Sequence, residues 1–132
     1  MCSSDLGICC LIPGRKYSRN IRVTRIVDTF LEHARVWYFG NGGKPKLFLG
    51  SPDWMRRNLY RRIEAVTPIL DPDLKRELSD MLSIQLSDKR KACFVDDHLR
   101  NRWKSARPQK EKVRAQYTFY EYLKSGELRV ES

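Results

Sequence analysis

Apolar residues alternate with polar ones, or gather in short runs, along much of the chain. These patterns are typical of strands, and they predict strands at residues 7–12, 21–24, 36–39, 46–50, 63–69 and 92–95. Gly40-Asn41-Gly42-Gly43 separates two of them and has the composition of a hairpin turn. We therefore expect residues 36–50 to form a β-hairpin.

Three segments show apolar positions at helical spacing instead. Helices are predicted at residues 26–31, 71–86 and 113–124, and an Asp-Pro pair opens the second of them. Asp is a preferred N-cap residue and Pro a preferred first helical residue, so the start of this helix is well defined. Residues 54–62 are basic, and we expect them to form a loop or an irregular helix.

Strands interleaved with helices predict an α/β fold with a mixed β-sheet flanked by helices. No change in composition marks a linker, so we expect residues 7–124 to form one unit, between residues 1–6 and a tail at 125–132. The 132 residues are 41% hydrophobic, which is enough for a packed core. No apolar run approaches the ~20 residues that span a bilayer, and the start lacks the features of a secretory leader. We expect a cytoplasmic location.

The charge balance favours a particular class of partner. Lys and Arg total 26 against 16 Asp and Glu, which gives a net charge of +10. Such an excess favours a polyanion, which includes nucleic acid, anionic lipid, nucleotide and polyphosphate. A solvated basic surface that keeps the domain soluble is the alternative, and charge alone does not choose among these.

Cysteine and histidine are too sparse and too scattered for a metal centre. The spacing contains no C-x-x-C pair, so we predict no metal site and expect buried thiols in a reducing compartment. The residues concerned are Cys2, Cys9, Cys10, Cys93, His33 and His98. No role is assigned to His98.

One cluster of residues points to chemistry. His33 precedes the 36–39 strand, and side-chain alternation places it on the same face as Arg35. The hairpin brings the end of the 46–50 strand near this point. We therefore expect His33, Ser51, Arg57 and Glu64 to line one pocket. Arg35 lies beside His33, and Arg62 belongs to the block that opens the next strand.

This mixture of side chains suits phosphoryl transfer. Arginines bind phosphate oxygens and offset their charge, an imidazole accepts phosphate or moves a proton, and a carboxylate orients either group. Each residue taken singly has a plainer interpretation, since a lone His near a strand is often structural and paired Arg residues often lie on a solvated face. The ordered set is what indicates a site.

The chain resembles class-1 bacterial polyphosphate kinase in seven blocks that occur in the family's order. They are Gly7-Ile8-Cys9-Cys10-Leu11-Ile12-Pro13-Gly14, Asn20-Ile21-Arg22-Val23, Phe30-Leu31-Glu32-His33, Phe39-Gly40-Asn41-Gly42-Gly43, Asp53-Trp54-Met55-Arg56-Arg57-Asn58, Arg62-Ile63-Glu64 and Lys112-Val113-Arg114-Ala115-Gln116.

The resemblance implies a fold and a reaction. The fold is the second of two C-terminal domains similar to phospholipase D. The reaction is the reversible transfer of the terminal phosphate of ATP to a polyphosphate chain through a phosphohistidine in another domain, with ADP as product. Mg²⁺ is held mainly by the other domains. The implied partners are polyphosphate, ATP, the remainder of the kinase chain and further copies of it, with no specific nucleic acid. The implied location is cytoplasmic or peripheral to the inner membrane face.

The resemblance also assigns roles to residues. His33 matches the family's second conserved His, which assists the transfer from the opposite side as an acid/base group or phosphate ligand. Arg57 and Arg62 match positions that bind ATP or polyphosphate. Glu64 matches a position that organises the pocket, and Arg35 and Ser51 lie beside it in the predicted arrangement.

Two departures from the family pattern concern the start of the chain. The family has an Arg immediately before its first Gly-x-Cys strand, and that Arg contacts nucleotide phosphate, whereas this chain has Leu6. Residues 1–6 resemble nothing in the family and suggest a truncation or a junction. The domain that carries the phosphorylated His is also missing, so we expect this chain to be catalytically inactive by itself.

Two alternatives remain open. One is half of a phospholipase D-like phosphodiesterase or nuclease, although such enzymes use His-x-Lys where this chain has His33-Ala34-Arg35. Arg is a poor proton donor because its pKa stays above about 12. The other is a non-catalytic basic module that binds polyanions, and competition between polyphosphate and single-stranded DNA would distinguish it.

Overall fold

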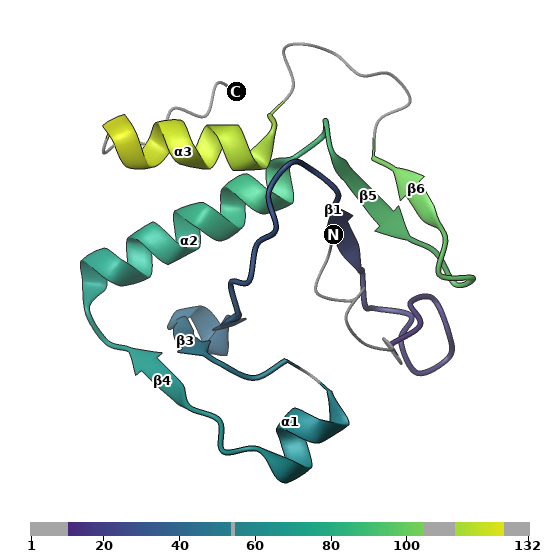
Figure 1. Ribbon diagram of the computed structural model, residues 1–132, viewed down its shortest axis with the longest axis horizontal. Helices are drawn as coiled ribbons and strands as arrows, with labels where there is room; N and C mark the ends of the chain where they lie inside the picture. The colour runs from purple at the N-terminus through teal and green to yellow at the C-terminus, as the bar shows by residue number, and fades with distance from the viewer. Residues whose placement is uncertain (1–10, 54, 105–112, 126–132) are drawn as a thin grey trace.

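The computed structural model describes residues 11–53, 55–104 and 113–125, and Figure 1 shows its ribbon. The described strands form two three-stranded sheets, ordered β1–β5–β6 and β2–β3–β4, and every pair is antiparallel. The strands are β1 (Thr24–Ile26), β2 (Val36–Phe39), β3 (Lys46–Gly50), β4 (Val66–Ile69), β5 (Ala92–Val95) and β6 (Asn101–Trp103). The helices are α1 (Arg56–Arg61), α2 (Pro72–Ser87) and α3 (Ala115–Ser125), with a 3-10 turn, η2 (Asn41–Gly43).

The predicted hairpin is confirmed. Val36 pairs with Leu49 and Phe39 with Lys46, and the η2 turn joins the two strands. Gly42 and Gly43 have φ angles of 62° and 88°. Glycine adopts these left-handed angles without steric cost, which explains the Gly-rich connection. The hairpin therefore fixes where residues 35 and 50 lie relative to each other.

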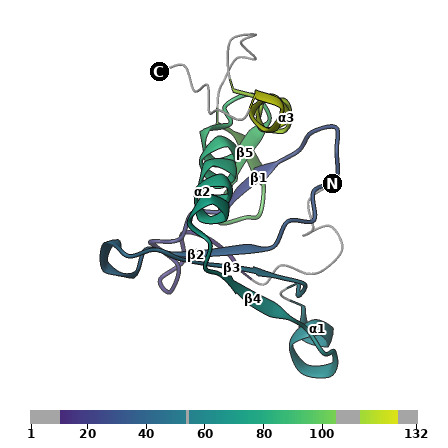
Figure 2. The same cartoon turned by 90° about the vertical axis from the view of Figure 1, so that its left-hand side faces the viewer.

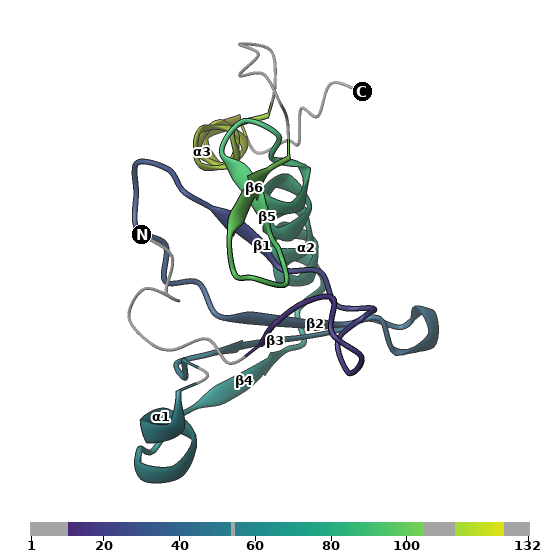
Figure 3. The ribbon, with the colours of Figure 1, turned by 90° about the vertical axis from the view of Figure 1, so that its right-hand side faces the viewer.

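Helix α2 runs from the sheet β2–β3–β4 to the other sheet. Figures 2 and 3 show it starting after β4 and continuing beside β1 and β5 toward α3. Its start is as predicted: Pro72 is the first helical residue, and Oδ1 of Asp71 accepts hydrogen bonds from the backbone N–H groups of Asp73 and Leu74, each at 2.9 Å. Its buried face belongs to a small core that consists of Leu47, Met81, Ile84, Ala92, Cys93, Val95 and Ala115.

The buried carboxylate of Asp88 connects α2, β5 and α3. Its Oδ1 accepts hydrogen bonds from the backbone N–H groups of Arg90, Lys91 and Ala92 at 2.6–3.0 Å. Its Oδ2 accepts one from the N–H of Ala115 at 2.7 Å. A helix leaves its first N–H groups without partners inside the helix, so this carboxylate caps the start of α3.

Two predicted elements differ from the structure. The helix predicted at 26–31 is wrong, because β1 ends at Ile26 and residues 27–35 contain neither helix nor strand. The backbone N–H and C=O of Phe30 are bonded to the side chain of Gln116 instead of to a helical turn. The strand predicted at 21–24 is shifted, since β1 covers 24–26 and pairs with β5 there.

Other boundaries moved less. Strand β4 starts at Val66 and not at Ile63, because the pairing with β3 begins opposite Gly50. Strand β6 was not predicted, and α1 gives residues 56–61 a regular helix. The predicted strand at 7–12 falls mostly outside the described residues. The α/β class itself is confirmed. None of the described helices is long and apolar enough to cross a membrane.

Candidate functional site

The hairpin places the segment that carries His33 against the end of β3. The backbone N–H of Gly50 donates a hydrogen bond to the carbonyl oxygen of Arg35 at 3.1 Å. The guanidinium of Arg35 then bridges two partners: Nε lies 2.8 Å from Oδ1 of Asp53, and Nη1 donates to the carbonyl oxygen of His33 at 3.0 Å. The backbone at His33 is therefore tied to Asp53 through one arginine side chain.

A second contact joins the end of β3 to the segment before β4. The hydroxyl of Ser51 donates to Oε2 of Glu64 at 2.5 Å and accepts from the N–H of Ala65 at 3.2 Å. The N–H of Ser51 donates to the carbonyl oxygen of Ala65 at 3.0 Å. These bonds hold Glu64 beside the strand ends, as the sequence predicted for Ser51 and Glu64.

Asp53 is the charged centre of this region, and sequence analysis did not assign it a role. The hydrogen bond from Arg35 holds the pKa of Asp53 below its usual range, against the effect of burial, and the charges of His33 and Arg57 lower it further. The same bond raises the pKa of Arg35, with an added contribution from Glu64. Asp53 could have been identified from its position, because it lies two residues after Ser51 and just beyond the end of a paired strand.

The remaining predicted residues have exposed side chains, and the charges of two of them, His33 and Arg57, act on Asp53. The side chains of His33, Arg57 and Arg62 are exposed, whereas Arg35 and Asp53 are half-buried, at 26% and 21% exposure. Arg57 lies on α1, and Arg62 ends that helix with an extended backbone. Among the described residues, no hydrogen bond or ion pair joins the His33 imidazole or the Arg62 guanidinium to the other site residues. The structure therefore pairs Arg35 with Asp53 and Ser51 with Glu64, and it leaves the side chains of His33 and Arg62 exposed to solvent.

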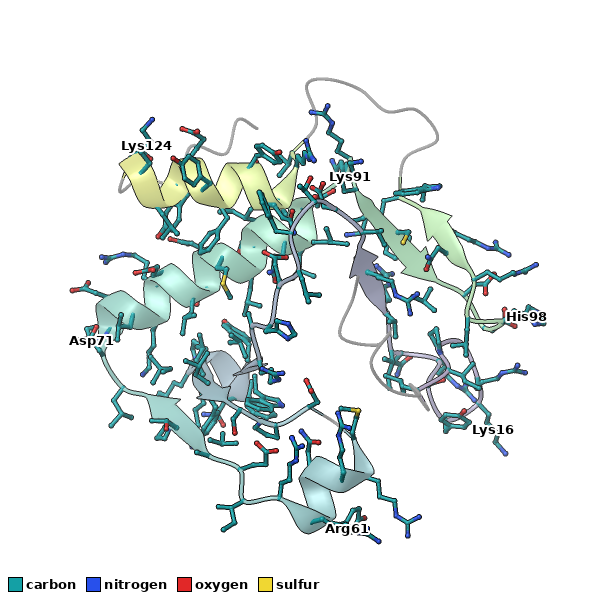
Figure 4. The ribbon with its side chains drawn as sticks, viewed as in Figure 1. Lys16, Arg61, Asp71, Lys91, His98 and Lys124 are labelled. Atoms are coloured by element: carbon teal, nitrogen blue, oxygen red, sulfur yellow. The ribbon has the colours of Figure 1, made fainter. Side chains whose placement is uncertain are left out.

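His98 lies far from this region. Figure 4 labels His98 on the turn between β5 and β6 and Arg61 on α1, at well-separated positions in the molecule. The imidazole Nε2 of His98 lies 3.9 Å from Oδ1 of Asp97, and its backbone N–H donates to Oδ1 of Asp96 at 2.9 Å.

Two surface hollows occur elsewhere. The larger, of about 720 Å³, lies between the segment 30–38 and α2, and it is mostly apolar, with Phe30, Val36, Leu82 and Leu86 in its wall. The smaller, of about 570 Å³, lies beside β5. Neither of these two hollows is lined by His33, Arg57 or Glu64.

The described residues offer no ready metal site. Within residues 11–53, 55–104 and 113–125, no group of three or more His, Cys, Asp or Glu side chains is arranged to hold a metal ion. The two carboxylates of the site are bound to Arg35 and Ser51. These residues do not fit a resident Mg²⁺ ion, which usually takes one or two free carboxylates together with substrate phosphates. The thiol of Cys93 is buried and donates to the carbonyl oxygen of Arg25.

A family model described as "Polyphosphate kinase C-terminal domain 2" matches residues 6–116. The chain belongs to this family. Among curated relatives, the polyphosphate kinase of Escherichia coli K12 is 49% identical over 122 residues, which is 92% of this chain and 18% of the relative. The polyphosphate kinase of Synechocystis is 54% identical over 87 residues, which is 65% of this chain and 12% of the relative.

A solved structure supports the family's fold for this chain. The crystal structure of polyphosphate kinase from Porphyromonas gingivalis is 56% identical and has a TM-score of 0.84, with 91% of this chain and 18% of that chain covered. The resemblance noted from the sequence is thus confirmed, together with the fold class. The chain spans 18% of the length of the E. coli relative. The activity of a whole polyphosphate kinase therefore concerns more residues than are present here.

Proposed function

We propose that this chain supplies the second histidine-bearing half of the active site of a polyphosphate kinase. The whole enzyme transfers the terminal phosphate of ATP to polyphosphate, so that ADP is released and the polymer grows by one phosphate, and the transfer is reversible. A phosphohistidine in the remainder of the chain carries the phosphate between the two steps. The proposal is carried by the likeness to proteins named polyphosphate kinase over 92% of the chain.

His33, Arg57 and Arg62 are the residues proposed to act on phosphate. Their exposed side chains are available to a ligand, and the two arginines offer forked donors to phosphate oxygens. His33 serves as an acid/base group or phosphate ligand. Mg²⁺ comes with the nucleotide and is held mainly by the remainder of the chain, because the site carboxylates Asp53 and Glu64 are bonded to Arg35 and Ser51.

Arg35, Ser51 and Glu64 are proposed to organise the site. The guanidinium of Arg35 donates hydrogen bonds to Asp53 and to the carbonyl oxygen of His33, and the hydroxyl of Ser51 donates one to Glu64. These pairs keep the strand ends in register. Their part is to set geometry, which matters because positioning and electrostatics supply most of the rate in phosphoryl transfer.

The chain alone is proposed to bind polyphosphate without catalysing transfer. It lacks the phosphorylated histidine, and half of a phosphate clamp does not hold an in-line geometry. Partners are the remainder of the kinase chain and, in the full-length protein, further copies of it. The phospholipase D-like alternative is disfavoured, since Arg35 is paired with Asp53 and its raised pKa makes it a still poorer proton donor.

Polyphosphate binding tests the ligand class. Calorimetry with polyphosphate at several salt concentrations should give an affinity that falls linearly with salt on logarithmic axes, because phosphate contacts release counterions. His33→Ala and Arg57→Ala should weaken binding, whereas His98→Ala, a matched exposed histidine far from the site, should not. Single-stranded DNA should compete poorly. Equal competition by DNA, with no effect of His33→Ala, would instead identify a general polyanion-binding module.

A further inference from the structure

The segment that carries His33 is held by two side chains at and just before the start of α3. Residues 27–35 connect β1 to β2 without helix or strand, so their backbone needs other anchors. The first anchor is Arg114, one residue before α3. Its Nε lies 2.8 Å from Oδ2 of Asp28, its Nη2 also bonds Oδ1 of Asp28, and Nη2 donates to Oγ1 of Thr29 at 2.9 Å. The Asp28 side chain is only 1% exposed.

The second anchor is the amide of Gln116. Its Oε1 accepts a hydrogen bond from the N–H of Phe30 at 2.9 Å, and its Nε2 donates to the carbonyl oxygen of Phe30 at 2.6 Å. One side chain thus satisfies both backbone groups of Phe30, as a neighbouring strand would. Gln116 is itself buried. Phe30 lies three residues before His33.

Aromatic contacts reinforce both anchors. The guanidinium of Arg114 lies over the ring of Tyr117, 4.1 Å from its centroid, and the rings of Phe30 and Tyr117 have centroids 6.4 Å apart. The start of α3 is fixed in turn, because Asp88 caps Ala115. The anchors therefore rest on the buried end of a helix and not on a loose loop.

At its other end the same segment is held by Arg35. This side chain binds Asp53 and the carbonyl oxygen of His33. Only residues 31–34 lie between the two points of attachment, and their side chains are exposed. The place that His33 occupies therefore depends on both attachments, one from α3 and one from the loop after β3.

We propose that Arg114 and Gln116 are positioning residues for His33, so that the start of α3 sets where this histidine meets a phosphate ligand. This inference rests on the proposed function of His33. A purely structural role for the two residues, in which they only fasten α3 to the domain, predicts something different. It predicts lower stability on substitution, with no separate effect on His33 or on ligand binding.

Gln116→Met is the variant that separates the two roles, because it keeps the volume of the side chain and removes both hydrogen bonds to Phe30. Tyr122→Phe is the matched control, since it removes the only described hydrogen bond between the side chains of α2 and α3, from Tyr122 to Asp80, and touches nothing in 27–35. The chain contains two histidines, so a histidine-labelled sample gives ring signals for His33 and for His98 as an internal reference. Tripolyphosphate is the probe.

Gln116→Met should shift the ring signals of His33, leave those of His98 in place and weaken tripolyphosphate binding about tenfold. Tyr122→Phe should change neither. Gln116→Met should add nothing to His33→Ala, because a positioning effect requires the histidine. The inference is overturned if folded Gln116→Met has unchanged His33 signals and unchanged tripolyphosphate affinity. It is also overturned if the losses of affinity from Gln116→Met and His33→Ala add in the double variant.

The same experiment separates this inference from the proposed function. If His33→Ala itself leaves tripolyphosphate binding unchanged, the proposed role of His33 is overturned, and the ring signals of Gln116→Met still decide whether α3 positions the segment. If Gln116→Met does not fold, Arg114→Lys takes its place. Lys retains the charge but loses the forked bond to Asp28, and His33 signals that remain unshifted in this variant overturn the inference.

Discussion

Nε of Arg35 lies 2.8 Å from Oδ1 of Asp53, which joins the residue two positions after His33 to the loop that follows β3. This pair gives a physical reason for arginine at the third position of His33-Ala34-Arg35. The forked guanidinium reaches the carboxylate of Asp53 and the carbonyl oxygen of His33 together, and a lysine ammonium offers no such fixed geometry. The sequence motif therefore encodes an anchor as well as a charge.

Arg35→Lys should weaken polyphosphate binding severalfold although the net charge is unchanged, because the backbone at His33 loses one of its supports. Calorimetry with polyphosphate at fixed salt measures the effect. Arg76→Lys is the control, since Arg76 forms an exposed ion pair with Asp73 on α2, away from the site. If both variants bind equally well, Arg35 contributes charge and no positioning.

Acid should destabilise the chain through Asp28. The hydrogen bond from Arg114 holds the pKa of Asp28 below its usual value, and burial opposes this only in part. A carboxyl group with a lowered folded-state pKa stabilises the fold above its unfolded pKa of about 3.9, and that stability is lost as the pH falls toward the folded value. Asp28→Asn should therefore lower the free energy of unfolding at pH 7. Below about pH 4, the free energy of unfolding of this variant should fall less steeply with decreasing pH than that of the unsubstituted chain.

Urea unfolding between pH 7 and pH 3 measures this change. Asp73→Asn serves as the matched control, because the pair of Asp73 with Arg76 is exposed at both ends and such pairs contribute about 0–1 kcal/mol. The free energy of unfolding of Asp73→Asn should depend on pH as steeply as that of the unsubstituted chain. If the free energy of unfolding of Asp28→Asn falls with pH in parallel with that of the unsubstituted chain, Asp28 does not contribute to the acid destabilisation.

Much of the fold was predictable because local signals agreed with the final packing. The hairpin at 36–50 and the start of α2 follow from turn and capping residues, and they are observed where predicted. The predicted helix at 26–31 was wrong because its partners, Arg114 and Gln116, come from the far end of the chain. Periodicity cannot reveal a backbone that is bonded by distant side chains.

The same limit applied to the candidate site. Ser51 and Glu64 could be placed together because they flank two paired strands. Asp53 was overlooked, since its importance depends on the guanidinium of Arg35 reaching it across the sheet edge. Roles for His33, Arg57 and Arg62 came from the family resemblance, and they stay predictions.

Gly50→Ala should destabilise the domain. A Cβ at this position would lie 2.6 Å and 2.8 Å from two atoms of the Trp37 ring and 3.0 Å from the carbonyl oxygen of Ala65. Crowding of this kind costs about 1–3 kcal/mol. Gly40→Ala is the control, because nothing lies within 4 Å of a Cβ there. Urea midpoints compare the two, and equal midpoints would mean that the Trp37 ring moves aside without cost.

Asp88→Ala should destabilise the domain more than Asp71→Ala. Both residues cap helices, but Asp88 is fully buried and bonds four backbone N–H groups, whereas Asp71 is exposed and bonds two. Loss of an exposed cap costs about 1 kcal/mol, and buried donors left without partners cost about 1–3 kcal/mol more. Urea unfolding of both variants tests this order, and the reverse order contradicts the central position of Asp88.

The proposed role of His33 can be tested by supplying the remainder of a polyphosphate kinase. The chain is mixed with a family polyphosphate kinase shortened to end before the matched region, and ATP-dependent polyphosphate synthesis is assayed. Synthesis should occur with the unsubstituted chain and with His98→Ala, and it should not occur with His33→Ala. Synthesis that proceeds equally well with His33→Ala, or that fails with a folded unsubstituted chain, would contradict the claim that this chain supplies the second histidine of the site.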